Sequence, residues 1–115
     1  MAQGSKWEEI RTFINRKFVN VTTVNAATYD LLAIDDILNV TYTGTAAVTS
    51  LTLPTAQSVV GRIITIKDAG YNAGTNNITI DTEGAELINN GDTYVINADG
   101  NSIDIYSDGT DWHVK

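Results

Sequence analysis

The spacing of apolar residues changes near residue 20, and this change divides the chain into two parts. In the first part apolar residues recur every three or four positions, which places them on one face of an α-helix. Ser5 and Glu8 form a capping-box pattern at the start of this stretch. We therefore predict a short amphipathic helix within residues 1–20. Its apolar face consists of Trp7, Ile10, Phe13, Ile14 and Phe18.

A helix this short is marginal in water on its own, so its apolar face must pack against another surface. That surface is the rest of the chain, sister helices in an oligomer, or a partner protein. The basic residues Arg11, Arg16 and Lys17 lie on the same segment. We expect residues 1–20 to serve for docking or trimerisation, through the apolar face together with these basic side chains.

After residue 20 apolar and polar residues alternate, as they do around Ile64 and Ile66. A period of two is typical of strands with one buried and one solvated face. We expect one all-β domain over residues 21–115, built as a small antiparallel sandwich, a barrel-like unit or a short intertwined β-helix. The predicted strands are Tyr29–Ile34, Ile37–Thr43, Val48–Leu53, Arg62–Lys67, Ile78–Thr82, Glu86–Asn89, Thr93–Asn97, Ser102–Tyr106 and Asp111–Val114.

Turn-forming residues separate these strands. Asp108-Gly109, which lies between two alternating segments, is a strong hairpin signal. The stretch of residues 68–77 is the longest connection in the predicted domain. We expect it to project as the distal, partner-facing loop. Its candidate binding residues are Asp68, Tyr71, Asn72 and Asn76.

Composition excludes several classes of function. The 115 residues include no cysteine and one histidine, which excludes a disulfide framework, a thiol nucleophile and a histidine cluster within one chain. Residues 1–20 carry +2 (four basic, two acidic) and the rest carry −9 (three basic, twelve acidic), which gives −7 in total. So acidic a domain argues against nucleic-acid binding. Since the sequence shows neither a long apolar run nor a signal peptide, we expect no membrane span and synthesis in the cytoplasm.

Two polar patterns resemble reactive sites. Alternating oxygen ligands of the kind that bind calcium occur at Asn97, Asp99, Asn101 and Asp104. However, Ser102 and Asp108 stand where an EF-hand loop needs Gly and Glu, so a polar turn is the simpler interpretation. Asp35-Asp36 would need another carboxylate across a cleft for glycoside hydrolysis. We interpret this pair as a turn at a strand junction.

Sugars stack on exposed aromatic rings, so the expected exposure of each aromatic residue bears on carbohydrate binding. Trp112 is expected to pack in the core, and Tyr94 and Tyr106 are interpreted as core or interface aromatics. Tyr71, in the long loop, is the best candidate for an exposed ring. His113 follows Trp112 in a strand and is therefore expected to point away from it, toward solvent.

From about residue 20 onward the chain resembles the C-terminal β-module of bacteriophage tail fibres, tailspikes and related virion appendages. The resemblance rests on the runs TLPTAQSVVGRIITIKDAGYNAGTNNITID (Thr52–Asp81) and INNGDTYVINADGNSIDIYSDGTDWHVK (Ile88–Lys115). The upstream run TYDLLAIDDILNVTYT (Thr28–Thr43) is similar to the opening hairpin of that module. The positions that fit its pattern are Leu53, Pro54, Gly61, Arg62, Lys67, Asp68, Asn77, Ile78, Gly109 and Trp112.

The resemblance implies a virion structural protein that assembles as a homotrimer and has no catalytic residue and no cofactor. A short chain behind a single helix favours a small head fibre, a capsid decoration protein or a tail-fibre module. Its expected partners are other capsid or tail proteins, with a host surface glycan as a further partner. The alternative is a carbohydrate-binding, receptor-binding sandwich that uses exposed aromatic residues such as Tyr71.

Overall fold

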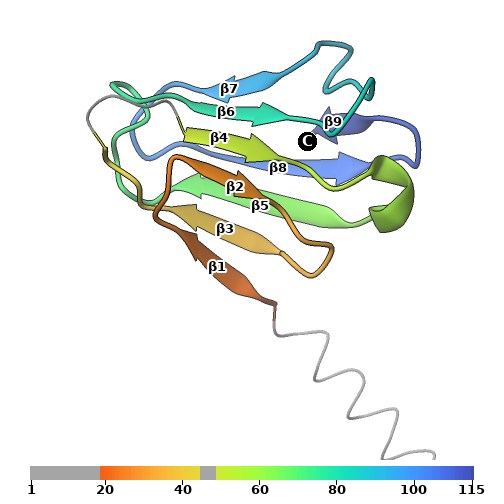
Figure 1. Ribbon diagram of the computed structural model, residues 1–115, viewed down its shortest axis with the longest axis horizontal. Coiled ribbons are helices and arrows are strands. Elements are labelled where there is room, and N and C mark those ends of the chain that lie inside the picture. Colours follow the sequence, from red (N-terminus) through yellow and green to blue (C-terminus); the bar gives the residue numbers. More distant parts are fainter. Residues whose placement is uncertain (1–18, 45–48) are drawn as a thin grey trace, which may run out of the picture.

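The computed structural model describes residues 19–44 and 49–115. The predicted helix and its binding residues, from Trp7 to Phe18, lie outside this range. Within it the chain forms two mixed β-sheets (Figure 1), which confirms the all-β prediction. The five-stranded sheet has the order β1 (Val21–Val24), β3 (Ile37–Val40), β5 (Ile63–Asp68), β8 (Ser102–Ser107), β9 (Trp112–Val114). The four-stranded sheet has the order β2 (Thr28–Asp30), β4 (Thr49–Thr52), β6 (Ile78–Asp81), β7 (Tyr94–Ile96).

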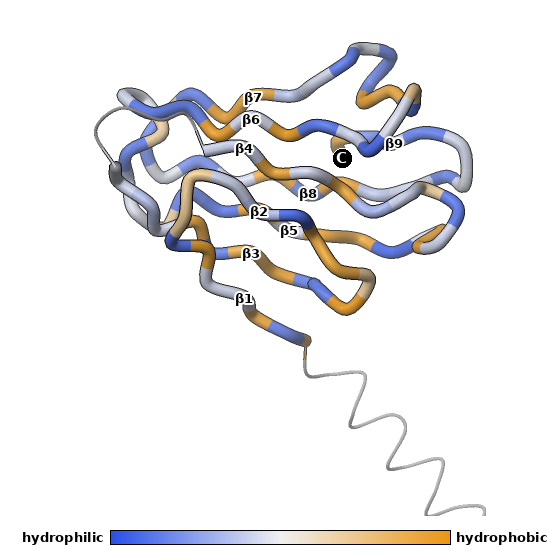
Figure 2. Tube along the Cα trace, viewed as in Figure 1, coloured by the Kyte–Doolittle hydropathy of each residue, from blue (hydrophilic) through white to orange (hydrophobic). Residues whose placement is uncertain are grey.

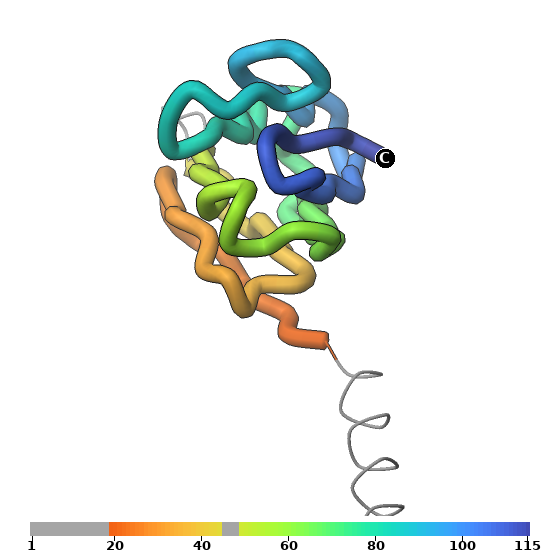
Figure 3. The backbone as a smooth tube through the Cα atoms, turned by 90° about the vertical axis from the view of Figure 1, so that its right-hand side faces the viewer, coloured from red at the N-terminus to blue at the C-terminus, as the bar shows by residue number. Residues whose placement is uncertain are grey.

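The first six strands wind between the two sheets like the coils of a solenoid. Strands β1, β3 and β5 run parallel in one sheet, and β2, β4 and β6 run parallel in the other. Each strand of the first sheet is followed by a strand of the second, so β1–β2, β3–β4 and β5–β6 make three stacked coils. Figure 3 looks along the strands and shows the chain passing from one layer to the other. A short 3₁₀-helix, Ala56–Val59, precedes the third coil.

The expectation of an antiparallel sandwich is wrong for these six strands. Their turns do not reverse the chain within one sheet but carry it across to the other sheet, so neighbouring strands become parallel. Each sheet still has one buried and one solvated face, which is the alternation that antiparallel sheets usually produce. The sequence pattern is therefore the same for both arrangements.

Antiparallel strands close the stack after the third coil. Strand β7 pairs with β6, β8 pairs with β5, and β9 pairs with β8. Residues Leu87 to Gly91 then cover the outer edge of β9, since the Trp112 N–H donates to the Leu87 carbonyl at 2.8 Å. The predicted strand Glu86–Asn89 is reduced to an isolated parallel bridge between Ile88 and Trp112, because Asn89 (φ 49°) and Asn90 (φ 66°) form a tight turn.

The opposite end of the stack has a different character. Strands β1 and β2 belong to the first coil, and each is the edge strand of its sheet. In the part of the chain that the structure describes, no strand lies beside the outer edge of either one. Strand β1 was missed in the sequence, because its residues Val21–Val24 combine two apolar ends with two threonines and show no alternation. The stack therefore has an open end at β1 and β2, whereas at the other end the edge of β9 is covered and β7 is the edge strand of the four-stranded sheet.

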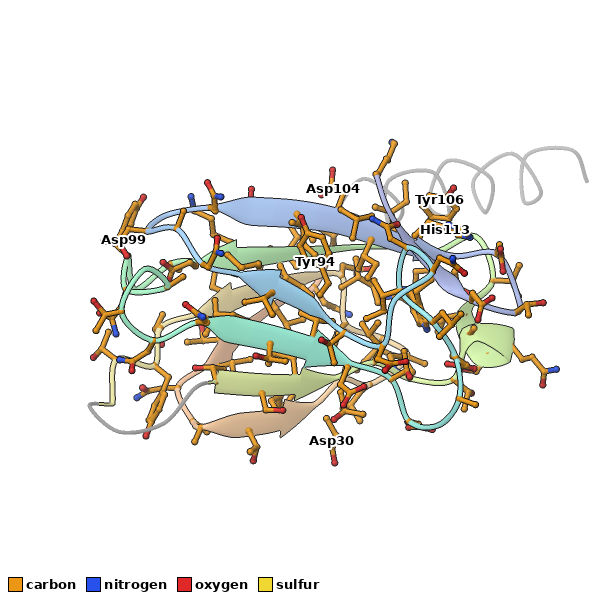
Figure 4. The ribbon with its side chains drawn as sticks, turned by 90° about the horizontal axis from the view of Figure 1, so that it is seen from above. Asp30, Tyr94, Asp99, Asp104, Tyr106 and His113 are labelled. Atoms are coloured by element: carbon orange, nitrogen blue, oxygen red, sulfur yellow. The ribbon has the colours of Figure 1, made fainter. Side chains whose placement is uncertain are left out.

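Side chains that point between the sheets form one hydrophobic core. Trp112 is fully buried in it, as predicted, and Tyr94 packs against it. Other fully buried members are Leu38, Leu51, Leu53, Ile64, Ile66, Ile80 and Ile105. The outer faces are polar: Figure 4 shows Asp30 and Asp104 on opposite sides of the sandwich, each pointing away from it.

Candidate functional site

The predicted distal loop is built around a buried carboxylate. Asp68 ends β5 and is only 2% exposed. Its Oδ2 atom accepts the backbone N–H groups of Asn72 and Ala73, both at 2.8 Å, and that of Gly100 at 3.0 Å. Asp68 therefore fixes the loop of residues 69–77 against the turn of residues 98–101.

Tyr71 lies on the outside of this braced loop. Its side chain is 64% exposed, and its φ of 53° lies in the left-handed region that bulky residues rarely adopt. The ring lies against Gly100, where an added Cβ would approach Tyr71 Cε1 to 2.7 Å. The Lys67 ammonium lies 5.3 Å from the ring centroid and donates to the Gly100 carbonyl. The tyrosine predicted to be exposed is thus also held in one orientation.

Two further predicted residues belong to this loop. Asn72 and Asn76 are half-exposed on the same loop. A second contact joins the loop to the neighbouring turn, since the Gly74 N–H donates to Asp99 Oδ1 at 2.8 Å. The structure therefore gathers the four predicted residues at one end of the sandwich. They have different roles, because Asp68 is buried whereas Tyr71 is the most exposed side chain of the four.

A second surface, which sequence reasoning missed, lies on the first coil. Four apolar side chains there are exposed, and we call them the first-coil patch: Val19 (51%), Val21 (57%), Leu32 (56%) and Ile34 (61%). Hydrogen bonds of 2.9 Å join its two segments, from the Asn20 side-chain amide to the Ile34 carbonyl and from the Ile37 N–H to the Asn20 carbonyl. Figure 2 shows apolar colour both at the start of β1 and in the connection from β2 to β3.

A buried aspartate holds the first-coil patch in place. Asp35 is 2% exposed and accepts hydrogen bonds from Thr22 Oγ1 (2.7 Å), from the Tyr29 hydroxyl (2.8 Å) and from the Leu32 N–H (2.8 Å). Burial and the neighbouring Asp35 carboxylate raise the pKa of Tyr29 to about 12. These bonds brace the turn beneath Leu32, and they confirm the interpretation of Asp35 as a turn residue.

Its neighbour Asp36 makes a separate set of contacts. Asp36 Oδ1 accepts a charged hydrogen bond from Arg62 at 2.6 Å, and Asp36 Oδ2 accepts the Asn20 N–H at 2.9 Å. Both carboxylates of the pair are thus engaged by side chains or backbone of the same end of the molecule. The pair serves to tie β1 and the start of β5 to the β2–β3 connection.

The two surfaces lie at opposite ends of the strands. The first-coil patch lies beside the starts of β1 and β3, whereas the Tyr71 loop follows the end of β5. Because β1, β3 and β5 are parallel, their starts meet at one end of the sheet and their finishes at the other. Figure 1 shows the connection from β2 to β3 on the right and the connection from β5 to β6 on the left.

The polar pattern near residue 100 is a turn, as predicted. The Asn101 N–H donates to the Ala98 carbonyl at 3.2 Å, and Gly100 has a φ of 76°. Asp104 lies apart from it on β8, where its Oδ1 accepts the Thr65 hydroxyl at 2.7 Å. Among residues 19–44 and 49–115, no group of three or more His, Cys, Asp and Glu side chains is arranged to hold a metal ion.

The C-terminal hairpin carries the only histidine of the sequence. His113 points away from the buried Trp112, as predicted, and its Nε2 lies 2.7 Å from Asp108 Oδ2. Its ring stacks on Tyr106 at 5.4 Å between centroids (Figure 4). The adjacent Ser107 hydroxyl donates to the Ala56 carbonyl at 2.6 Å instead of to the imidazole. Asp108 and His113 therefore form a pair, whereas the Ser107 hydroxyl bonds to the backbone of the 3₁₀-helix.

No helix in the described ranges has both the length and the apolarity needed to cross a membrane. Comparisons of the sequence with protein-family models and with curated proteins found no match.

Proposed function

We propose that this chain is a non-enzymatic structural component of a phage-type particle: a small head fibre, a capsid decoration protein or a tail-fibre module. In this role it forms a homotrimer, attaches to capsid or tail proteins through residues 1–20, and resides in the virion after synthesis in the host cytoplasm. The resemblance of residues 20–115 to virion appendage modules motivates the proposal.

The observation that carries this proposal is that the two ends of the β-domain differ. The uncovered strands β1 and β2 and the first-coil patch lie at the N-terminal end of the described domain, and the patch includes Val19, which belongs to the predicted docking segment of residues 1–20. Exposed edge strands and exposed apolar side chains are surfaces that proteins cover by association. The braced Tyr71 loop lies at the other end of the strands. An appendage needs such an arrangement, with one end for attachment and the other turned outward.

The charge distribution supports the same orientation. Residues 1–20 carry +2, whereas residues 21–115 carry −9 (three basic, twelve acidic). A basic segment joined to an acidic domain favours contact of the N-terminal end with an acidic particle surface and repels the rest of the domain from it.

The test is quantitative mass spectrometry of purified particles from the phage or prophage that encodes the chain. We expect the wild-type chain in the particles and at least a tenfold loss of the double variant W7D/I10D, with the circular dichroism of the β-domain unchanged. V95D, on the outer face of β7, is the matched control and should be incorporated normally. Absence of the wild-type chain from the particles would refute the structural role, and normal incorporation of W7D/I10D would refute docking through residues 1–20.

A further inference from the structure

The Tyr71 loop has the features of a preorganised binding platform. A bulky residue with a positive φ is strained, and such strain persists only where surrounding contacts impose it. Here the contacts are the three N–H groups bound by Asp68 and the Gly74 to Asp99 hydrogen bond. They hold an aromatic ring in solvent, 64% exposed, although an apolar ring gains nothing from water. A ring fixed in advance loses little conformational entropy when a ligand covers it.

The surroundings of the ring indicate the chemistry of its ligand. Within residues 69–77 and 97–101 the other apolar side chains are alanines, and Ala73 is fully buried. The accessible groups are amides, hydroxyls and one carboxylate: Asn72, Thr75, Asn76, Asn97, Asp99 and Asn101. Amides and hydroxyls both donate and accept hydrogen bonds, as sugar hydroxyls do. An apolar peptide would need an apolar groove, whereas one aromatic ring among amides suits a pyranose, which has an apolar C–H face and a polar rim.

The electrostatics select among saccharides. The Lys67 ammonium near the ring is already bonded to the Gly100 carbonyl, and Asp99 is exposed beside it. The domain as a whole is acidic, with −9 over residues 21–115 (three basic, twelve acidic). Like charges repel, so an anionic polysaccharide is disfavoured at this end. We infer that the exposed face of Tyr71 binds a neutral hexose or N-acetylhexosamine unit of a glycan, with Asn72, Asn76 and Asn101 as hydrogen-bonding neighbours.

This inference does not depend on the particle role, because the isolated chain is sufficient to test it. The 115-residue chain is applied to an array of neutral oligosaccharides of glucose, galactose, mannose and N-acetylhexosamines. Binding to any of them is then measured by NMR titration. The C–H protons on one face of the bound sugar should shift upfield, since they lie over an aromatic ring.

Matched variants separate the ring from the loop. Y71N removes the ring but keeps a residue that tolerates a positive φ, so the fold should be retained. We expect at least a tenfold loss of affinity for Y71N, affinity within threefold of wild type for Y71F, and no change for I63N, at the exposed start of β5 and the opposite end of the strands. The inference is overturned if no neutral glycan binds, if Y71N binds as well as wild type, or if anionic glycans bind better than neutral ones.

Discussion

The Asp68 carboxylate and the backbone N–H of Gly100 form a hydrogen bond of 3.0 Å between residues that are 32 positions apart. It joins the loop after β5 to the turn before β8, and thereby the third coil to the strands that close the stack. The same oxygen accepts two N–H groups of the loop itself. One buried carboxylate therefore determines the conformation of the end of the molecule that presents Tyr71.

Replacement of Asp68 by alanine should destabilise the protein by about 3 kcal/mol, because three backbone donors lose their acceptor in a buried site. Urea denaturation followed by circular dichroism measures this change. The control is D30N, since Asp30 is exposed on the outer face of β2, and its effect should stay within about 0.5 kcal/mol. A D68A protein as stable as D30N would show that the loop does not depend on this carboxylate.

Gly100→Ala should cost about 1–2 kcal/mol. Gly100 has a φ of 76°, and an added Cβ would lie 2.7 Å from Tyr71 Cε1, so both the backbone and the ring must move. The matched control is Gly84→Ala, where a Cβ meets no atom within 4 Å and where loss of chain entropy in the unfolded state should leave stability equal or slightly higher. Equal thermal midpoints for the two variants would contradict the close approach of Tyr71 to Gly100.

Stability should fall between pH 10 and pH 12 through Tyr29. Its pKa is raised from 10.0 to about 12 in the folded protein, chiefly by burial and by the Asp35 carboxylate. The hydroxyl therefore loses its proton in the unfolded chain first, and the associated stability, complete below pH 10, disappears as the pH rises through 12. Tyr29 is half-buried and partly screened by water, so the expected difference is below about 1.4 kcal/mol.

The Tyr29 effect is isolated by comparing wild type with Y29F at pH 9, 10 and 11. Other tyrosines and lysines titrate in the same range, but they are common to both proteins. The difference in urea midpoint should shrink as the pH rises. A constant difference would indicate that the Tyr29 hydroxyl does not interact with Asp35 in solution. Y71F, which alters an exposed hydroxyl, should show the wild-type pH dependence.

Asp108 should make the C-terminal hairpin sensitive to acid. Hydrogen bonds from the backbone N–H groups of Asp111 and Thr110, together with His113, lower the pKa of Asp108 from 3.8 to about 2. The stabilisation is present above the unfolded pKa and is lost as the pH falls through 2. Urea midpoints at pH 5, 4, 3 and 2 should therefore converge for wild type and D108N. A gap that stays constant down to pH 2 would exclude Asp108 as the titrating group.

Local features of the fold were predictable from the sequence. The alternation around Ile64 and Ile66 correctly predicted β5, and the Asp108-Gly109 pair correctly predicted the β8–β9 hairpin, in which Gly109 has a φ of 98°. The parallel winding was not predictable, because a strand with one buried face has the same alternation whichever way its neighbour runs. The direction is decided by connections that cross between sheets, and these leave no distinct residue pattern.

The candidate sites were likewise predictable only where a local sequence pattern reveals them. Tyr71 was identified because an aromatic residue in a long polar loop has no core to enter. The role of Asp68 depends on Gly100, which is 32 residues away, and no local pattern connects them. The first-coil patch did leave a signal: the run Leu31-Leu32-Ala33-Ile34 holds more consecutive apolar residues than one face of a strand can bury. The sequence analysis instead assigned these residues to the predicted strand Tyr29–Ile34, which is wrong beyond Asp30, where β2 ends.

The double variant V21D/I34D should weaken self-association. If the first coil, β1–β2, contacts another subunit, Val21 and Ile34 of the first-coil patch become buried on assembly. Charged replacements at both sites would then have to be desolvated. Light scattering coupled to size exclusion should give the mass of three chains for wild type and of one chain for V21D/I34D. Because both residues are exposed in the single chain, circular dichroism should remain unchanged.

The control for this prediction is V95D, an exposed apolar residue on the outer face of β7, far from the first coil in the strand order. It adds the same charge and should leave the mass at three chains. A wild-type protein with the mass of one chain would mean that the domain folds without sister subunits, and that any association requires the particle itself. If V21D/I34D still has the mass of three chains, the subunit contact lies away from the first coil, and residues 1–18 are the segment to test next.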